Sequence, residues 1–120
     1  MATRSEGHWL EVETVGDIAV ARFTRRRIVQ EDSVEKAGEQ LLGLPEDTGC
    51  RKVVLNFSKV EGMTTALIGK LVATHRKIEQ SGGRLVLCEV GTPLQEIFTL
   101  CKLPQLVSIY KQEQEALQSF

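Results

Sequence analysis

The sequence predicts an α/β fold: a mixed sheet of about four to five strands that begins with a β-hairpin and packs against about four helices. Apolar runs at Val53–Phe57 and Arg84–Cys88 are typical of strands buried on both faces, as in a parallel sheet. The segment between them, from Ala66 to Ile78, carries an apolar stripe at helical spacing. Strand, helix and strand in this order indicate a βαβ crossover, which is right-handed almost without exception.

The elements before this unit are a hairpin and a helix. Residues 9–15 and 18–24 flank Gly16-Asp17, and a two-residue turn with Gly first is compatible with a type II′ hairpin. A helix is expected from Glu31 to Leu42, because Asp32 with Glu35 resembles a capping box and Gly43 lies just past the end. Residues 45–49 then form a turn-rich connection.

The Ser-Gly-Gly run at residues 81–83 ends the central helix, since Gly adopts the left-handed conformation of a C-cap. Thr92-Pro93 marks the start of another helix, with Thr92 as the cap and Pro93 at the first helical position. Leu103-Pro104 ends that helix. Residues 107–110 are expected to form a last strand, and residues 112–118 a terminal helix whose polar residues face water.

Size and charge favour one soluble domain, residues 1–120, with residues 1–7 flexible. The net charge of -1 provides no field to recruit nucleic acid or an anionic membrane, and aromatic residues are only 5% of the chain. No apolar run approaches the roughly 18 residues of a membrane span. The first eight residues have no signal-peptide core, so a cytoplasmic protein is expected.

The chain lacks the usual signals of catalysis and of metal binding. Cys50, Cys88 and Cys101 are odd in number and widely spaced, which argues against a disulfide framework and a zinc site. His8 and His75 have no local partner at metal-ligand spacing, and Cys88 is expected to act as a small hydrophobic residue. Phosphate-binding glycine motifs and a G-x-S-x-G nucleophile are absent. We therefore expect no enzymatic activity, no metal and no cofactor.

The loop at residues 58–66 is the candidate site. Partners of open α/β sheets dock at the carboxyl ends of the strands, and the central helix begins there with Thr64 and Thr65. One interpretation is structural, because Thr is a good N-cap. The other is phosphorylation, which adds nearly two negative charges at a helix start and would expel a docked partner.

Arg25-Arg26-Arg27 follows the predicted hairpin. This run is either a solvated loop or a small basic patch that meets a phosphate or an acidic partner surface.

The central unit resembles the STAS domain, the module of bacterial anti-sigma factor antagonists. The resemblance runs through residues 53–60, residues 63–71, the Gly82-Gly-Arg-Leu-Val-Leu-Cys run and residues 93–103. It implies a regulatory protein-interaction module that binds a kinase-type anti-sigma factor and is switched by phosphorylation of a hydroxyl at the helix start. Counting back from Gly82-Gly83 without a gap places Thr65 at the phosphoacceptor position, with Thr64 as the other candidate.

The chain departs from the family pattern at three points. Thr64 stands where the family has an Asp, Ala66 replaces the second hydroxyl residue, and Leu67 replaces a Gly. In addition, the three arginines stand where a Gly-and-Asp pattern follows the early strands. The alternative is therefore a STAS scaffold or sensor that binds a protein or small ligand without a switch. Under the resemblance the partner-binding residues would be Met63, Thr64, Thr65, Ala66, Ile68, Gly69 and Arg26.

Overall fold

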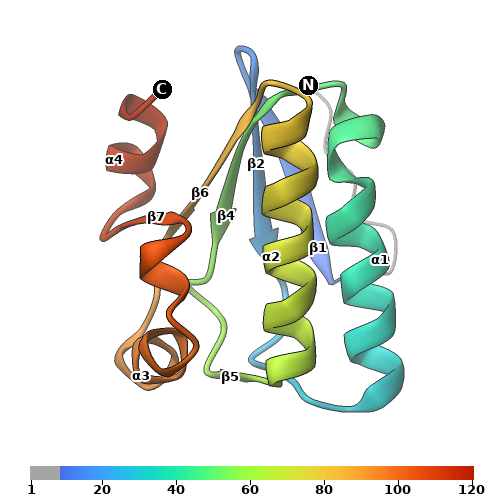
Figure 1. Cartoon of the computed structure of the whole chain (residues 1–120), viewed down its shortest axis with the longest axis vertical. Helices are drawn as coiled ribbons and strands as arrows, with labels where there is room; N and C mark the ends of the chain where they lie inside the picture. Colours follow the sequence, from blue (N-terminus) through green and yellow to red (C-terminus); the bar gives the residue numbers. More distant parts are fainter. Residues whose placement is uncertain (1–8) are drawn as a thin grey trace.

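Five strands form a mixed sheet in the order β1-β2-β4-β6-β7 (Figure 1). The computed structural model describes residues 9–120, so the expectation for residues 1–7 lies outside the described residues. β1 pairs antiparallel with β2, and the pairs β2–β4, β4–β6 and β6–β7 are parallel. The predicted mixed sheet is confirmed, with strands at Leu10–Val15 (β1), Ile18–Phe23 (β2), Lys52–Asn56 (β4), Arg84–Cys88 (β6) and Ser108–Tyr110 (β7).

The predicted hairpin at the start of the chain is also confirmed. Val15 pairs with Ile18 across a two-residue turn. Gly16 has φ +63°, and Asp17 is not among the residues with positive φ. A positive φ at the first central position alone is what a type II′ turn requires.

Helices cover both faces of the sheet. α1 (Glu31–Thr48) and α2 (Thr65–Gln80) pack side by side on one face, and α3 (Thr92–Leu100) adds Leu94 and Phe98 to the same core. The short α4 (Glu113–Gln118) covers the other face, where its Ala116 joins Val20, Val54 and Val86 in a second, smaller core. The middle of the central strands is apolar on both faces because α4 covers the face that α1 and α2 leave open.

Two short strands were not predicted. β3 (Arg27–Ile28) pairs in parallel with β5 (Gly62–Met63), forming a small separate sheet next to the start of α2. Two-residue strands leave no periodic pattern in a sequence, which is why the run of arginines gave no sign of this pairing.

The predicted end of the first helix was wrong. α1 continues through Gly43 and Pro45 to Thr48, and Gly49 is the left-handed C-cap with φ +69°. Burial explains the extension, since Leu44 continues the buried stripe and is 1% exposed. The predicted capping box is also absent: the N-cap is Gln30, and no side chain makes a capping hydrogen bond.

The later helix boundaries need smaller corrections. Gly91, rather than Thr92, is the N-cap of α3, and that helix ends at Leu100. A 3₁₀ turn occupies Leu103–Gln105. The predicted end of α2 is confirmed, because Gly82 is left-handed with φ +84° and the Gly83 N–H donates to the Ile78 carbonyl at 2.9 Å.

Candidate functional site

The two threonines at the start of α2 have different structural roles. Thr64 is the N-cap, with extended backbone (φ −84°, ψ 159°), and its Oγ1 accepts a hydrogen bond from the Leu67 N–H at 3.2 Å. Thr65 is the first helical residue and is exposed. Its side chain takes part in none of the hydrogen bonds found within residues 9–120. The capping interpretation therefore applies to Thr64, and the Thr65 hydroxyl faces solvent.

The small β3–β5 sheet holds the segment that leads into this helix. Arg27 pairs with Gly62, and Ile28 pairs with Met63. The Arg26 carbonyl accepts hydrogen bonds from the N–H groups of Glu61 at 2.7 Å and Gly62 at 3.1 Å. Figure 1 shows β5 and the start of α2 together at the lower edge of the molecule, toward which the arrow of β2 points. The arginine segment and the start of α2 thus belong to one hydrogen-bonded unit.

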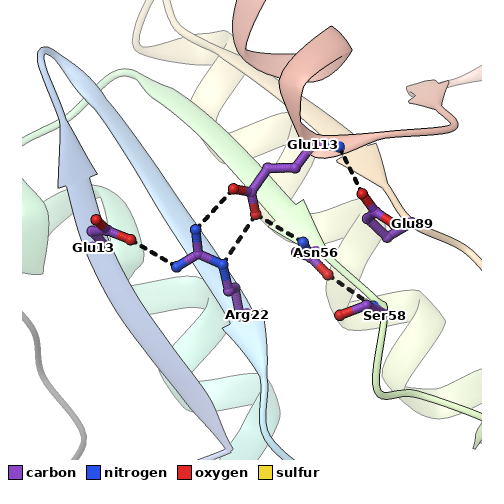
Figure 2. Close-up of polar contacts among 6 residues, drawn as sticks. All are labelled: Glu13, Arg22, Asn56, Ser58, Glu89 and Glu113. Atoms are coloured by element: carbon purple, nitrogen blue, oxygen red, sulfur yellow. Dashed lines mark hydrogen bonds and ion pairs between the residues drawn. The ribbon is translucent and has the colours of Figure 1, made fainter.

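A polar network crosses the other face of the sheet (Figure 2). Glu113, the first residue of α4, forms a bidentate ion pair with Arg22 of β2: Arg22 Nε donates to Oε1 at 3.0 Å and Nη2 to Oε2 at 2.8 Å. Asn56 Nδ2, at the end of β4, donates to the same Oε1 at 2.8 Å. The Glu113 N–H donates to a carboxylate oxygen of Glu89 at 2.9 Å. The Glu113 carboxylate therefore joins α4 to the neighbouring strands β2 and β4, and the Glu113 N–H joins it to the residue after β6.

The network also reaches the loop that precedes α2. Asn56 is 6% exposed, and its Oδ1 accepts a hydrogen bond from the Ser58 N–H at 2.8 Å, so both ends of the amide are used. Glu13 of β1 accepts a further bond from Arg22 Nη1 at 2.9 Å. The expectation that the polar residues of the terminal helix face water is wrong for Glu113.

The network perturbs the titration of nearby groups. Burial of Glu113 raises its pKa, but hydrogen bonds from Arg22 and Asn56 outweigh that effect and hold the pKa below its usual value. Burial raises the pKa of the Cys88 thiol to about 12, and the charges of Glu113 and Glu89 act in the same direction. Cys88 is fully buried and packs in the second core, as the sequence predicted.

The STAS domain family model matches residues 10–116, which is nearly the whole chain. The chain belongs to the STAS domain family. Its sequence is 26% identical over 68 residues to the anti-sigma F factor antagonist of Paenibacillus polymyxa. That match spans 57% of this chain and 58% of the relative, so it covers less than two thirds of the relative's length.

Solved structures share the fold of this STAS domain. TM1081 of Thermotoga maritima superimposes with a TM-score of 0.80 at 20% identity, covering 93% of this chain and 94% of that one. An anti-sigma factor antagonist from Mycobacterium paratuberculosis gives 0.79 at 17% identity, with 92% and 91% covered. Unphosphorylated SpoIIAA gives 0.69 at 17% identity, with 92% and 96% covered, and SpoIIAA of Bacillus has also been solved in a phosphorylated form. At these identities the likeness establishes the fold.

The STAS domain presents some of the predicted partner-binding residues and buries others. Thr65, Ala66, Gly69 and Arg26 are exposed, and Thr64 is half-buried. The side chains of two further members of the predicted set pack in the main core: Met63 is 6% exposed and Ile68 is 3% exposed. We therefore assign these two residues a packing role, and we define the α2 surface as Thr65, Ala66, Gly69 and Arg26.

The remaining polar candidates of this STAS domain lie away from the α2 surface. His75 is 8% exposed, its Nδ1 has no hydrogen-bond partner within the described chain, and its Nε2 lies 3.4 Å from a carboxylate oxygen of Glu79. His8 lies outside the described residues. From residue 9 to the end, no group of three or more His, Cys, Asp or Glu side chains is placed to hold a metal ion.

None of the helices within residues 9–120 combines the length and the apolar character needed to cross a bilayer.

Proposed function

We propose that this STAS domain is an anti-sigma factor antagonist, a non-enzymatic cytoplasmic regulator of transcription that binds a kinase-type anti-sigma factor through the α2 surface. Phosphorylation of Thr65 switches the interaction off. The observation that carries this proposal is the division of roles between the two threonines. Because Thr64 already caps the helix, the exposed Thr65 hydroxyl is left for another protein to modify.

The comparisons support the proposal from a separate direction. The Paenibacillus relative is named an anti-sigma F factor antagonist, and SpoIIAA is an anti-sigma factor antagonist whose structure exists both with and without phosphate. These names describe proteins that act on other proteins. We infer the same kind of partner here, with no nucleic acid and no membrane.

The switch follows from the chemistry of the modification. The Thr65 hydroxyl oxygen attacks the γ-phosphorus of ATP bound to the partner kinase, ADP leaves, and the hydroxyl proton is released. The new group carries between one and two negative charges at neutral pH and is larger than the hydroxyl. It would stand in the middle of the α2 surface, so a partner packed there loses contact through both bulk and charge.

Mass spectrometry tests the switch. The purified protein is incubated with ATP and the kinase-type anti-sigma factor encoded nearest to it in its genome, and the modified residue is located. We expect phosphate on Thr65 in the wild type and none in Thr65→Ala. Thr92 is a matched control, because it is also an exposed Thr at the first position of a helix. Phosphate on Thr92 or Thr64 in place of Thr65, or on no residue, would refute the switch.

A second candidate function is a STAS scaffold or sensor that binds its ligand constitutively. Two observations favour it: Thr64 stands at the family's Asp position, and a cavity of about 410 Å³ lies between α3 and β7. Its lining is mostly apolar and includes Val90, Phe98, Pro104, Ile109 and Tyr110. Unchanged partner binding by Thr65→Glu, with no phosphate on the protein in cells, would favour this candidate over the switch.

A further inference from the structure

Three consecutive arginines, one of them in the α2 surface, lie on the segment that pairs with the loop before α2. Arg25, Arg26 and Arg27 are all exposed. None of their guanidinium groups takes part in an ion pair with any residue from 9 to 120. Exposed arginines are usually solvated, and their presence alone does not indicate a binding site. Their position relative to Thr65 is therefore the observation that bears on binding.

Contacts at both ends hold this segment, a side-chain contact at Arg25 and backbone hydrogen bonds at Arg26 and Arg27. The Arg25 guanidinium carbon lies 4.5 Å from the centre of the Trp9 ring, a cation–π contact. The Arg26 carbonyl accepts the two N–H bonds from Glu61 and Gly62, and Arg27 pairs with Gly62 in the β3–β5 sheet. Only Met63 and Thr64 separate that pairing from Thr65. The arginine segment is therefore tied to the loop that leads directly into Thr65.

The charge in this region is positive. The exposed Lys59 adds a fourth cation. The loop at residues 58–64, whose backbone pairs with the arginine segment, contains one carboxylate, the exposed Glu61. The first turn of α2 contains no acidic residue, so nothing offsets the positive end of its dipole. Glu31 and Asp32 lie in the first turn of α1, where the helix dipole, equivalent to about half a positive charge, offsets them only in part. The four cations outnumber these two carboxylates and Glu61 together.

We propose that Arg25–Arg27 make the α2 surface an electropositive dock for an acidic surface of the protein partner. This inference rests on the proposed function, since it names the charge of the partner that docks there. It also gives phosphorylation a second effect. A phosphate on Thr65 would add up to about two negative charges next to the arginines and remove the attraction that steers the partner in.

Association kinetics with the kinase-type anti-sigma factor test the proposal. The double variant Arg26→Gln, Arg27→Gln should lower the association rate constant about tenfold at low salt, with the dissociation rate within about twofold. Arg51→Gln is the matched control, because Arg51 is also exposed but precedes β4 at the opposite edge of the sheet. The difference from wild type should close at about 0.5 M salt. Equal association rates for the double variant and the control would overturn the proposal.

A second measurement needs no partner. The ¹⁵N-labelled protein is titrated with a peptide of about eight glutamates, an acidic probe for the basic patch. We expect amide shifts concentrated at residues 25–27 and 59–66 and lost in the double variant. Shifts centred on the cations at Arg51, Lys52 and Arg84, or no shifts, would overturn the proposal. Because this experiment uses the chain alone, it separates failure of the electropositive dock from failure of the anti-sigma factor assignment.

Discussion

Arg22 and Glu113 are 91 residues apart in the chain and meet in a bidentate ion pair, with contacts of 3.0 and 2.8 Å. Arg22 lies in β2 and Glu113 begins α4, so this pair fixes the C-terminal helix to an inner strand of the sheet. Asn56 shares the carboxylate and uses its other end to hold Ser58, at the start of the loop that leads to β5 and α2. The network therefore links the position of α4 to the loop before the α2 surface.

Replacing Glu113 with Gln should weaken the attachment of α4. The amide keeps the shape of the carboxylate but loses the charge that Arg22 requires, and hydrogen bonds to charged groups contribute roughly 1.5–3 kcal/mol. Urea denaturation should show a loss of about 1–3 kcal/mol. Glu96→Gln is the control, because Glu96 is exposed and makes none of the hydrogen bonds found in residues 9–120. Equal stability of the two variants would contradict this role of the ion pair.

The stability that Glu113 contributes should depend on pH. Its pKa in the folded protein is below the usual 4.5, because the hydrogen bonds from Arg22 and Asn56 outweigh burial. A depressed folded pKa gives stability that is present above the unfolded value and is lost as the pH falls through the folded value. The difference between wild type and Glu113→Gln should therefore be constant near neutral pH and shrink below about pH 4.5. A difference that grows on acidification would contradict the sign of this effect.

Gly83 should tolerate no larger residue. A Cβ atom at this position would lie 2.1 Å from the Arg51 carbonyl oxygen and 2.9 Å from Ile78 Cγ2, so the backbone would have to move. Gly83→Ala should cost more than about 2 kcal/mol in the free energy of unfolding. At Gly69, inside α2, a Cβ would meet nothing within 4 Å, so Gly69→Ala should stabilise the helix by about 0.5–1 kcal/mol. Similar changes in the free energy of unfolding for the two variants would contradict this explanation of why Gly83 is restricted.

Alanine substitutions of Thr64 and Thr65 should have different effects on the free energy of unfolding. Thr64→Ala removes the oxygen that accepts the Leu67 N–H and should cost about 1 kcal/mol. Thr65→Ala removes an exposed hydroxyl at the first helical position and should change stability by less than about 0.5 kcal/mol. Thermal or urea denaturation of the two variants provides the comparison. A larger loss for Thr65→Ala would reverse the assignment of cap and acceptor.

Patterns within a short window predicted most of the fold, because apolar runs, glycine caps and helical stripes are local signals. Gly82-Gly83 and the two buried strands are examples. The predicted turn-rich connection at residues 45–49 is wrong, because Pro45 lies inside α1. Burial of Leu44 outweighs the hydrogen bond that a proline cannot donate. Tertiary packing decided that boundary.

The polar network could not be predicted from neighbouring residues, because its members come from opposite ends of the chain. Asn56 was the available signal: a buried polar residue within an apolar strand needs a partner. The sequence did not identify that partner, and Glu113 looked like part of a solvated face. The position of Arg26 near the start of α2 could not be predicted either. It depends on the pairing of β3 with β5, and two-residue strands leave no pattern in the sequence.

The affinity of the kinase-type anti-sigma factor for the chain before and after phosphorylation of Thr65 tests the central claim most directly. Isothermal titration calorimetry with the unmodified and the modified protein should show at least about a tenfold loss of affinity, equivalent to about 1.4 kcal/mol. Thr92→Glu, which adds charge at the start of a different helix, should bind like wild type. Equal affinity of the phosphorylated and unphosphorylated chains would contradict the account.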